Sequence, residues 1–135
     1  MINSRDTDEL TPLAKMYAIR FLNEAAVQNI PVLITCTYRD NEYQDHLYAQ
    51  GRTRPGNKVT KAKGGQSAHN YRVAFDFVPL DVFGRADWNN LDAFKKLGAI
   101  GKKVGLDWGG NWTSFVDMPH MQVPNFKIPT VTQTK

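Results

Sequence analysis

The sequence predicts a small α+β domain. Segments with helical apolar spacing or helix caps alternate with short apolar runs that are rich in β-branched or aromatic residues. The chain has 135 residues, of which 41% are hydrophobic and 22% charged, as expected of one soluble domain with its own core. No repeat, linker or shift in composition divides it, so we expect residues 1–135 to fold as a single domain.

The first helix is predicted from Thr11 to about Gln28. Thr11 followed by Pro12 is typical of an N-cap and a first helical position. The apolar residues that share one helical face are Ala14, Ala18, Phe21, Leu22 and Ala25. Pro31 ends this segment, and residues 32–37 are short, apolar and β-branched, which predicts a buried strand.

A second, short helix is expected to be capped by Asn41 and closed by Gly51. Residues 52–66 then form a long loop, and a loop of this length in a small domain usually has a function or is mobile. Residues 73–79 predict a second strand, which ends at Pro79.

A third helix is predicted to begin after Asn90 and to run to about Val104. Its inward-facing residues are expected to be Leu91, Phe94 and Leu97 or Gly98. A Gly-rich turn with Trp112 follows residues 106–108, and a final strand is expected near residues 120–123.

The charge and cysteine content narrow the classes of partner and site. The net charge of +4 favours an anionic partner, such as an acidic polymer or a membrane surface. Nucleic acid is not expected, because the basic segment 52–63 is poor in the aromatic residues of a stacking platform. The single cysteine, Cys36, rules out an internal disulfide framework and cysteine-rich zinc sites, and its apolar surroundings indicate a buried, inert thiol.

The start of the chain is polar and lacks the apolar core of a secretory signal, and no apolar run approaches transmembrane length. We therefore expect the protein to be made in a cytoplasm, without a signal peptide. If it acts outside the membrane, another protein must release it.

Two histidines and two aspartates suggest a catalytic metal site. His69 and Asp76 lie in one segment, and Asp117 and His120 lie in another. Two imidazoles and one carboxylate are a common ligand set for a catalytic zinc that keeps one position open for water. A further carboxylate that is close to a ligand, but is not itself a ligand, provides the general base that a zinc hydrolase needs.

Asp76 also has a simpler interpretation. It lies between Phe75 and Phe77 in an apolar strand, where an ionised carboxylate costs several kcal/mol unless it is paired or bound to a metal. An ion pair with Arg39 or Arg72 is therefore the alternative to metal binding.

Each histidine also has an alternative to a role as a metal ligand. His69, taken alone, is more often a surface or hydrogen-bonded histidine than a ligand. The chain has three histidines, and two of them fall in these segments. Pro119 favours an extended Met118, and from an extended segment Asp117 and His120 both reach one metal. His46, inside the second predicted helix, is expected to be structural or exposed.

Arg39 follows the first predicted strand and precedes the second helix, a place where functional side chains often lie. Its guanidinium suits a substrate carboxylate or a tetrahedral oxyanion, although an ordinary salt bridge is as consistent with the sequence. Trp108, Trp112 and Phe115 precede Asp117, and they either pack in the core or form one wall of a cleft.

Five stretches resemble the phage endolysins that are L-alanyl-D-glutamate peptidases, which belong to the D-alanyl-D-alanine carboxypeptidase-like (LAS) zinc metallopeptidases. These stretches are residues 38–39, 44–53, 64–71, 74–77 and 108–112 continuing to 120. Together with the first helix they cover nearly the whole chain, and a chance match to all five is improbable.

The resemblance implies that His69, Asp76 and His120 are the ligands of one zinc ion and that Asp117 is the general base. It also implies that Arg39 contacts the substrate or the developing oxyanion. The fold that it implies is a small α+β domain of the hedgehog and DD-peptidase type, in which an antiparallel sheet carries the zinc site and about three helices flank it.

Further site residues follow from the same resemblance. Ser67 matches the start of the family's Ser-x-His motif, where it supports the site. Ser67, Gln44, Trp108 and Trp112 are the expected substrate contacts. In one departure from the pattern, Arg72 stands between the first two ligands where relatives commonly have glycine. We expect this difference to affect the local turn or the access to the cleft.

The implied function is that of a phage endolysin that hydrolyses the L-alanyl-D-glutamate bond of the peptidoglycan stem peptide to lyse the host. Such an enzyme is made in the host cytoplasm, reaches the periplasm and cell wall after release by a holin, and acts as a monomer without a separate cell-wall-binding domain. A DD- or LD-carboxypeptidase that acts on stem peptides is the alternative with the same metal site. A non-catalytic binding domain is the third hypothesis, and the presence of Asp117 argues against it.

Overall fold

The computed structural model describes residues 1–129, which form a four-stranded antiparallel sheet and three α-helices. The strands are β1 (Val32–Cys36), β2 (Ala74–Pro79), β3 (Asp107–Trp108) and β4 (His120–Gln122), in the sheet order β1-β2-β4-β3. The helices are α1 (Pro12–Val27), α2 (Asn41–Ala49) and α3 (Leu91–Val104), with short 3-10 helices η1 (Thr7–Glu9), η2 (Ala68–Tyr71) and η3 (Gly109–Asn111). The predicted α+β class is confirmed. Within residues 1–129, no helix has the length and apolar character needed to cross a bilayer.

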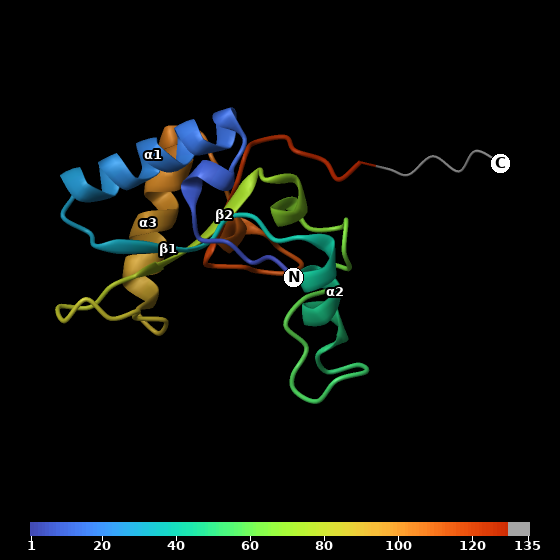
Figure 1. Cartoon of the computed structure of the whole chain (residues 1–135). Coiled ribbons are helices and arrows are strands. Elements are labelled where there is room, and N and C mark those ends of the chain that lie inside the picture. The colour runs from blue at the N-terminus through green and yellow to red at the C-terminus, as the bar shows by residue number, and fades with distance from the viewer. Residues whose placement is uncertain (130–135) are drawn as a thin grey trace.

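The core lies between one face of the sheet and helices α1 and α3, whereas α2 and the loop that follows it lie on the other side of β2 in the view of Figure 1. Phe21 of α1 packs against Phe75 and Phe77 of β2, with ring centroids 5.5 and 5.2 Å apart. Phe94 of α3 contacts Phe77 at 5.6 Å. Because side chains alternate along a strand, Asp76 points away from this core.

The register of the sheet brings site residues from three strands into one row. Asp76 in β2 lies opposite His120 in β4 and opposite Cys36 in β1. The pairing of β1 shifts between Ile34 and Cys36, which is a β-bulge. Bulges change the direction of side chains and are frequent beside active sites, and this bulge lies next to Asp76.

Side-chain caps begin all three α-helices. Thr11, Asp40 and Asn90 each accept a hydrogen bond from the backbone N–H three residues further along the chain. The predicted starts of α1 and α3 are confirmed. The predicted cap of α2, Asn41, is wrong by one position, because it is Asp40 whose carboxylate accepts the hydrogen bond at the start of this helix.

The predicted inner face of α3 is correct except at its first residue. Phe94, Leu97 and Gly98 are buried, but Leu91 is 54% exposed. Helical side chains lean toward the N-terminus, so a residue in the first turn extends past the end of the helix and covers no part of the core.

Helix α3 approaches β3 and β4 closely because it presents glycine there. A Cβ atom on Gly98 would lie 2.4 Å from the Trp108 ring, and one on Gly101 would lie 2.2 Å from the terminal carbon of Met121. Trp108 and Met121 are paired residues of β3 and β4. The two-residue strand β3 was not predicted, because so short a segment carries no periodicity.

We predict that Gly98→Ala lowers the free energy of unfolding by about 1–3 kcal/mol, because the added methyl group meets a packed indole ring. Gly101→Ala is the matched control on the same helix, since it gives the same gain in helix propensity. Its methyl group meets the end of the flexible Met121 side chain, so its cost is smaller. Urea denaturation followed by circular dichroism measures both, and equal stabilities of the two variants would contradict the packing argument.

Candidate metal centre

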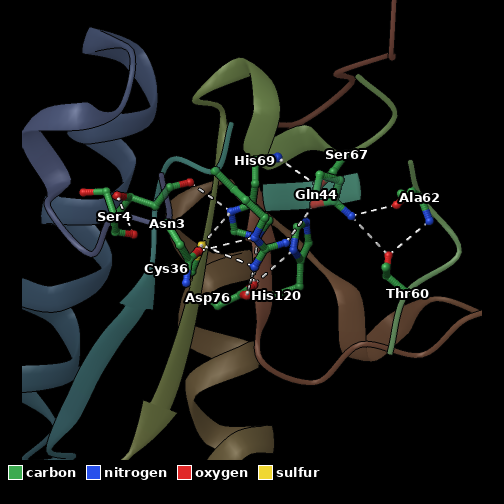
Figure 2. Close-up of polar contacts among 12 residues, drawn as sticks. Asn3, Ser4, Cys36, Gln44, Thr60, Ala62, Ser67, His69, Asp76 and His120 are labelled. Carbon is green, nitrogen blue, oxygen red and sulfur yellow. Dashed lines mark hydrogen bonds and ion pairs between the residues drawn. The ribbon is translucent and has the colours of Figure 1, made fainter. Parts of the chain in front are cut away.

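One carboxylate oxygen lies between two imidazole rings at the centre of the site (Figure 2). Asp76 Oδ1 is 3.1 Å from His69 Nε2 and 3.3 Å from His120 Nδ1. Ligand atoms at about 2.0–2.1 Å from a tetrahedral zinc ion are separated by about 3.3 Å, the edge of the tetrahedron. These nitrogen and oxygen atoms therefore have both the chemistry and the spacing of a metal ligand set.

The other nitrogen of each imidazole has its own hydrogen-bond acceptor. His69 Nδ1 donates to the carbonyl oxygen of Thr37 at 2.9 Å, and His120 Nε2 donates to Gln122 Oε1 at 2.8 Å. With these protons so placed, the lone pairs of His69 Nε2 and His120 Nδ1 point toward Asp76. Such partners select the tautomer and hold the ring orientation of metal-binding histidines.

The electrostatics of the site favour a positive charge beside Asp76. Desolvation would raise the pKa of this carboxyl, but the neighbouring imidazoles outweigh it and hold the pKa well below its usual range. Burial would likewise lower the pKa of His69, and the Asp76 carboxylate instead raises it. Asp76 is thus ionised and requires a cation or protons next to it, which a bound metal ion provides.

Cys36 is close to these residues but faces the back of the site. Cys36, His69 and Asp76 each offer a donor atom within 4.8 Å of the others. However, the Cys36 sulfur lies 3.6 Å from His69 Nδ1, the nitrogen that is already bonded to Thr37, whereas Nε2 is the nitrogen that faces Asp76. One imidazole does not bind one ion through both nitrogens, so the convergent set is His69, Asp76 and His120.

His69 is positioned by a capped 3-10 turn. Ser67 is the N-cap of η2, and its hydroxyl accepts a hydrogen bond from the His69 N–H at 3.2 Å. Asn70 completes the cap by accepting from the Ser67 N–H and donating to the Arg39 carbonyl at 2.8 Å. The Arg39 N–H in turn donates to the His69 carbonyl, so the loops that carry Arg39 and His69 are joined.

Arg72 ends this turn in the left-handed region of the backbone map, with φ 62° and ψ 30°. Glycine adopts this conformation without strain, which gives a physical reason for the glycine that the family resemblance implies at this position. The Arg72 guanidinium lies 3.8 Å from the centroid of the Tyr38 ring and forms an ion pair with Glu9. It is therefore turned away from Asp76, and the predicted alternative of an Arg72–Asp76 pair is wrong.

Asp117 enters the site from a tight turn. The His120 N–H donates to the Asp117 carbonyl at 3.1 Å, so residues 117–120 are not extended as predicted; this backbone bond closes a turn across Pro119. Gly109 packs directly against this turn, and only glycine fits there, because a Cβ atom would lie 2.3 Å from the Asp117 carbonyl oxygen. Burial raises the pKa of the Asp117 carboxyl above its usual value.

Arg39 is fixed beside the Asp76 carboxylate. Its Nη2 lies 3.9 Å from Asp76 Oδ2, and its Nη1 donates to Gln44 Oε1 at 3.1 Å. The Arg39–Asp76 ion pair, which the sequence offered as the alternative to metal binding, is thus formed, although only at the limit of ion-pair distance. It does not replace a metal, because the other Asp76 oxygen remains between two imidazoles.

A cavity of about 580 Å³ opens over these groups. Arg39 and Asp117 line it together with His69, Asp76 and His120. Ser67 and Trp112, two of the expected substrate contacts, line it as well. The other two expected contacts, Gln44 and Trp108, are 1% and 8% exposed and are not in the cavity wall. Gln44 instead holds Arg39, and Trp108 Nε1 donates to the Met118 carbonyl at 2.8 Å, so both act from behind the cavity.

Some residues of the site were not predicted. Thr37 and Gln122 orient the two imidazoles through contacts that no sequence spacing reveals. Thr60, Lys61 and Phe126 line the cavity from segments without periodicity. The sequence contained one signal for these cavity residues, namely the length and positive charge of the loop 52–66. It indicated that the loop has a function but not which of its residues line the cavity.

Comparison with known proteins identifies the family. A family model described as D-alanyl-D-alanine carboxypeptidase matches residues 60–123, which include His69, Asp76, Asp117 and His120. The peptidoglycan L-alanyl-D-glutamate endopeptidase CwlK of Bacillus subtilis is 39% identical over 126 residues, with 87% of this chain and 75% of that enzyme covered. The chain belongs to this metallopeptidase family. The family that the sequence motifs indicated is thereby confirmed.

Further relatives agree with this assignment. The L-alanyl-D-glutamate peptidase of Listeria phage A118 is 32% identical over 124 residues, and the match covers 90% of this chain but 40% of the phage enzyme. Among solved structures, the L-Ala D-Glu endopeptidase ChiX of Serratia marcescens has a TM-score of 0.67 at 18% identity, covering 90% of this chain and 88% of that one. The D,D-pentapeptidase VanY, solved with Zn(II), has a TM-score of 0.62 at 13% identity, covering 84% and 72%. These two structures share the fold.

We predict that Arg72→Gly is more stable than Arg72→Ala by about 1 kcal/mol, because alanine keeps the strain of a left-handed backbone and glycine does not. Both variants remove the same contacts with Glu9 and Tyr38, so their difference isolates the backbone. Thermal and urea denaturation of the two variants measure it. If the alanine variant is as stable as the glycine variant, the strain assigned to this position is absent.

Proposed function

We propose that the protein is a zinc-dependent peptidoglycan endopeptidase that hydrolyses the L-alanyl-D-glutamate bond of the stem peptide. The observation that carries the proposal is the Asp76 carboxylate held between His69 and His120, with Asp117 in the same cavity. The 39% identity to CwlK, whose name states this activity, supports the choice of bond.

Under this proposal His69 Nε2, Asp76 and His120 Nδ1 hold one zinc ion. When bound, zinc lowers the pKa of water toward neutrality and polarises a peptide carbonyl. The protein's own contribution begins with Thr37 and Gln122, which keep both imidazoles oriented through their second nitrogens.

Asp117 is the general base and then the general acid. Its carboxylate takes a proton from the attacking water and delivers it to the leaving amine of the substrate. Burial raises the pKa of Asp117, which makes its carboxylate a better proton acceptor than that of an exposed aspartate. The turn that ends at His120 holds Asp117 in the cavity wall, which also contains His69, Asp76 and His120.

Arg39 stabilises the negative charge that develops on the carbonyl oxygen. Gln44 holds one end of the guanidinium, and the other end lies 3.9 Å from Asp76 and faces the cavity. A donor that is fixed before the reaction stabilises a developing oxyanion without the cost of reorganising at that moment.

A phage endolysin is the biological role that we propose for this activity. The similarity to the Listeria phage peptidase supports this role, and the net charge of +4 suits an anionic cell wall. In this role the enzyme is made in the host cytoplasm, passes to the wall through a holin lesion and acts there as a monomer.

A carboxypeptidase is the second candidate, because the family model that matches residues 60–123 is described as a D-alanyl-D-alanine carboxypeptidase. The same metal site and general base would then release a terminal D-alanine from the stem peptide. The two candidates differ in the position of the cleaved bond, and therefore in the new termini that they produce.

The proposal is tested by digesting purified peptidoglycan and identifying the new termini by mass spectrometry. We expect new L-alanine carboxyl and D-glutamate amino ends that disappear with a chelator and return when zinc is added. Release of D-alanine alone would instead establish the carboxypeptidase. A folded, zinc-loaded protein that cleaves no bond would favour a binding role.

We predict that Asp117→Asn lowers the rate of cleavage by about 10²–10⁴-fold, because the amide cannot accept the proton of water. Zinc content and the circular dichroism spectrum should stay unchanged, since Asp117 is not a proposed ligand. Asp107→Asn, an exposed change of the same kind in β3, is the control and should keep full activity. Full activity of the Asp117 variant would contradict the assignment of the base.

We predict that Gln122→Leu weakens zinc binding by about 10-fold or more, because His120 loses the acceptor that orients its ring. Gln28→Leu, on the exposed end of α1, is the control that changes the same side chain elsewhere. Competition with a chromophoric chelator measures the zinc dissociation constant directly. Unchanged affinity would mean that Gln122 does not position His120.

A further inference from the structure

Lys61 lies in the wall of the cavity, on a part of the loop that is tied to the catalytic side of the site. The buried Gln44 donates through Nε2 to the Ala62 carbonyl at 2.8 Å and to Thr60 Oγ1 at 3.4 Å (Figure 2). The same amide accepts from Arg39 through its oxygen. The residues on both sides of Lys61 are therefore fixed with respect to Arg39, while the Lys61 side chain itself is exposed to the cavity.

The charged residues in the cavity wall are Arg39, Lys61, Asp76 and Asp117. Arg39 is engaged by Gln44 and by the Asp76 carboxylate. Lys61 forms no ion pair within residues 1–129, and its ammonium lies 5.2 Å from the centroid of the Phe115 ring across the cavity. An exposed contact of this kind is weaker than a charge-assisted hydrogen bond, so an anionic ligand readily displaces it.

The substrate of the proposed reaction carries an anion beside the bond that is cut. The nitrogen of D-glutamate belongs to that bond, and only one of its two carboxyl groups continues the stem peptide. The other carboxyl group remains as a free carboxylate within one residue of the reacting carbonyl. Asp117 repels such a group, and Arg39 is assigned to the reacting carbonyl oxygen, so a further cation in the same cavity is needed to hold it.

We propose that Lys61 binds the free carboxylate of the D-glutamate residue and so makes the enzyme select the acid over its amide. This inference rests on the proposed function and adds a specificity-determining residue to it. Lys61 has a compact ammonium on a long side chain, and Thr60 and Ala62 hold its backbone in place, which suits a point-charge contact to a carboxylate.

The test compares two synthetic stem peptides that differ only in this group, one with D-glutamate and one with its amidated form, D-isoglutamine. Lys61→Met should lower kcat/KM for the acid peptide by about 10-fold and leave that for the amide peptide nearly unchanged. Lys61→Arg should keep most of the activity toward the acid, because it keeps the charge. Lys58→Met removes the same charge from the same loop outside the cavity wall and should change neither value.

Phe115→Leu separates the Phe115 contact from substrate binding, because it removes the ring and leaves the ammonium free. This variant should retain the preference for the acid peptide. An equal loss on both peptides in Lys61→Met, or no loss on either, would overturn the inference while the endopeptidase activity stands. A wild-type protein that cleaves neither peptide at the alanyl bond would overturn the proposed function and this inference with it.

Discussion

The structure depends on one ionised carboxylate that the fold places in an aromatic strand. Phe75 and Phe77 on either side of Asp76 pack against α1 and α3, and the alternation of the strand turns Asp76 to the opposite face. A carboxylate in this position is costly unless its charge is compensated. The two imidazoles that share one of its oxygens, from η2 and β4, define the site, and protons on them or a metal ion between them compensate the charge.

The remaining features of the site keep that arrangement in place. The imidazoles are fixed by acceptors on their far sides, and the cap of η2 joins His69 to the Arg39 loop. Gln44, which is 1% exposed, connects Arg39 to the segment that carries Lys61. Hydrogen bonds thus run from Arg39, which forms a 3.9 Å ion pair with Asp76, through Gln44 to the cavity wall, so that binding and chemistry share one rigid support.

The sequence predicted those parts of the molecule that depend on local patterns. The caps and apolar periodicity located the helices to within a residue or two. The three residues of the expected ligand set, His69, Asp76 and His120, lie together in the structure. Asp76 was detectable because it breaks an apolar pattern at a place where a charge is costly.

The parts that could not be predicted depend on contacts between distant segments. Trp108 and Gln44 match motif positions, but only the packed structure places them behind the cavity. The turn from Asp117 to His120 is closed by a backbone bond and supported by Gly109, which the local bias of Pro119 did not indicate. Local preference is a weak guide wherever tertiary contacts fix the backbone.

X-ray absorption at the zinc edge of the purified, zinc-loaded protein tests the central claim most directly. The account predicts one ion per chain with only nitrogen and oxygen neighbours at about 2.0–2.1 Å and an outer-shell signal from two imidazoles. A sulfur neighbour at about 2.3 Å would place Cys36 in the coordination shell and contradict the set of His69, Asp76 and His120. Failure to bind zinc would contradict the metal centre itself.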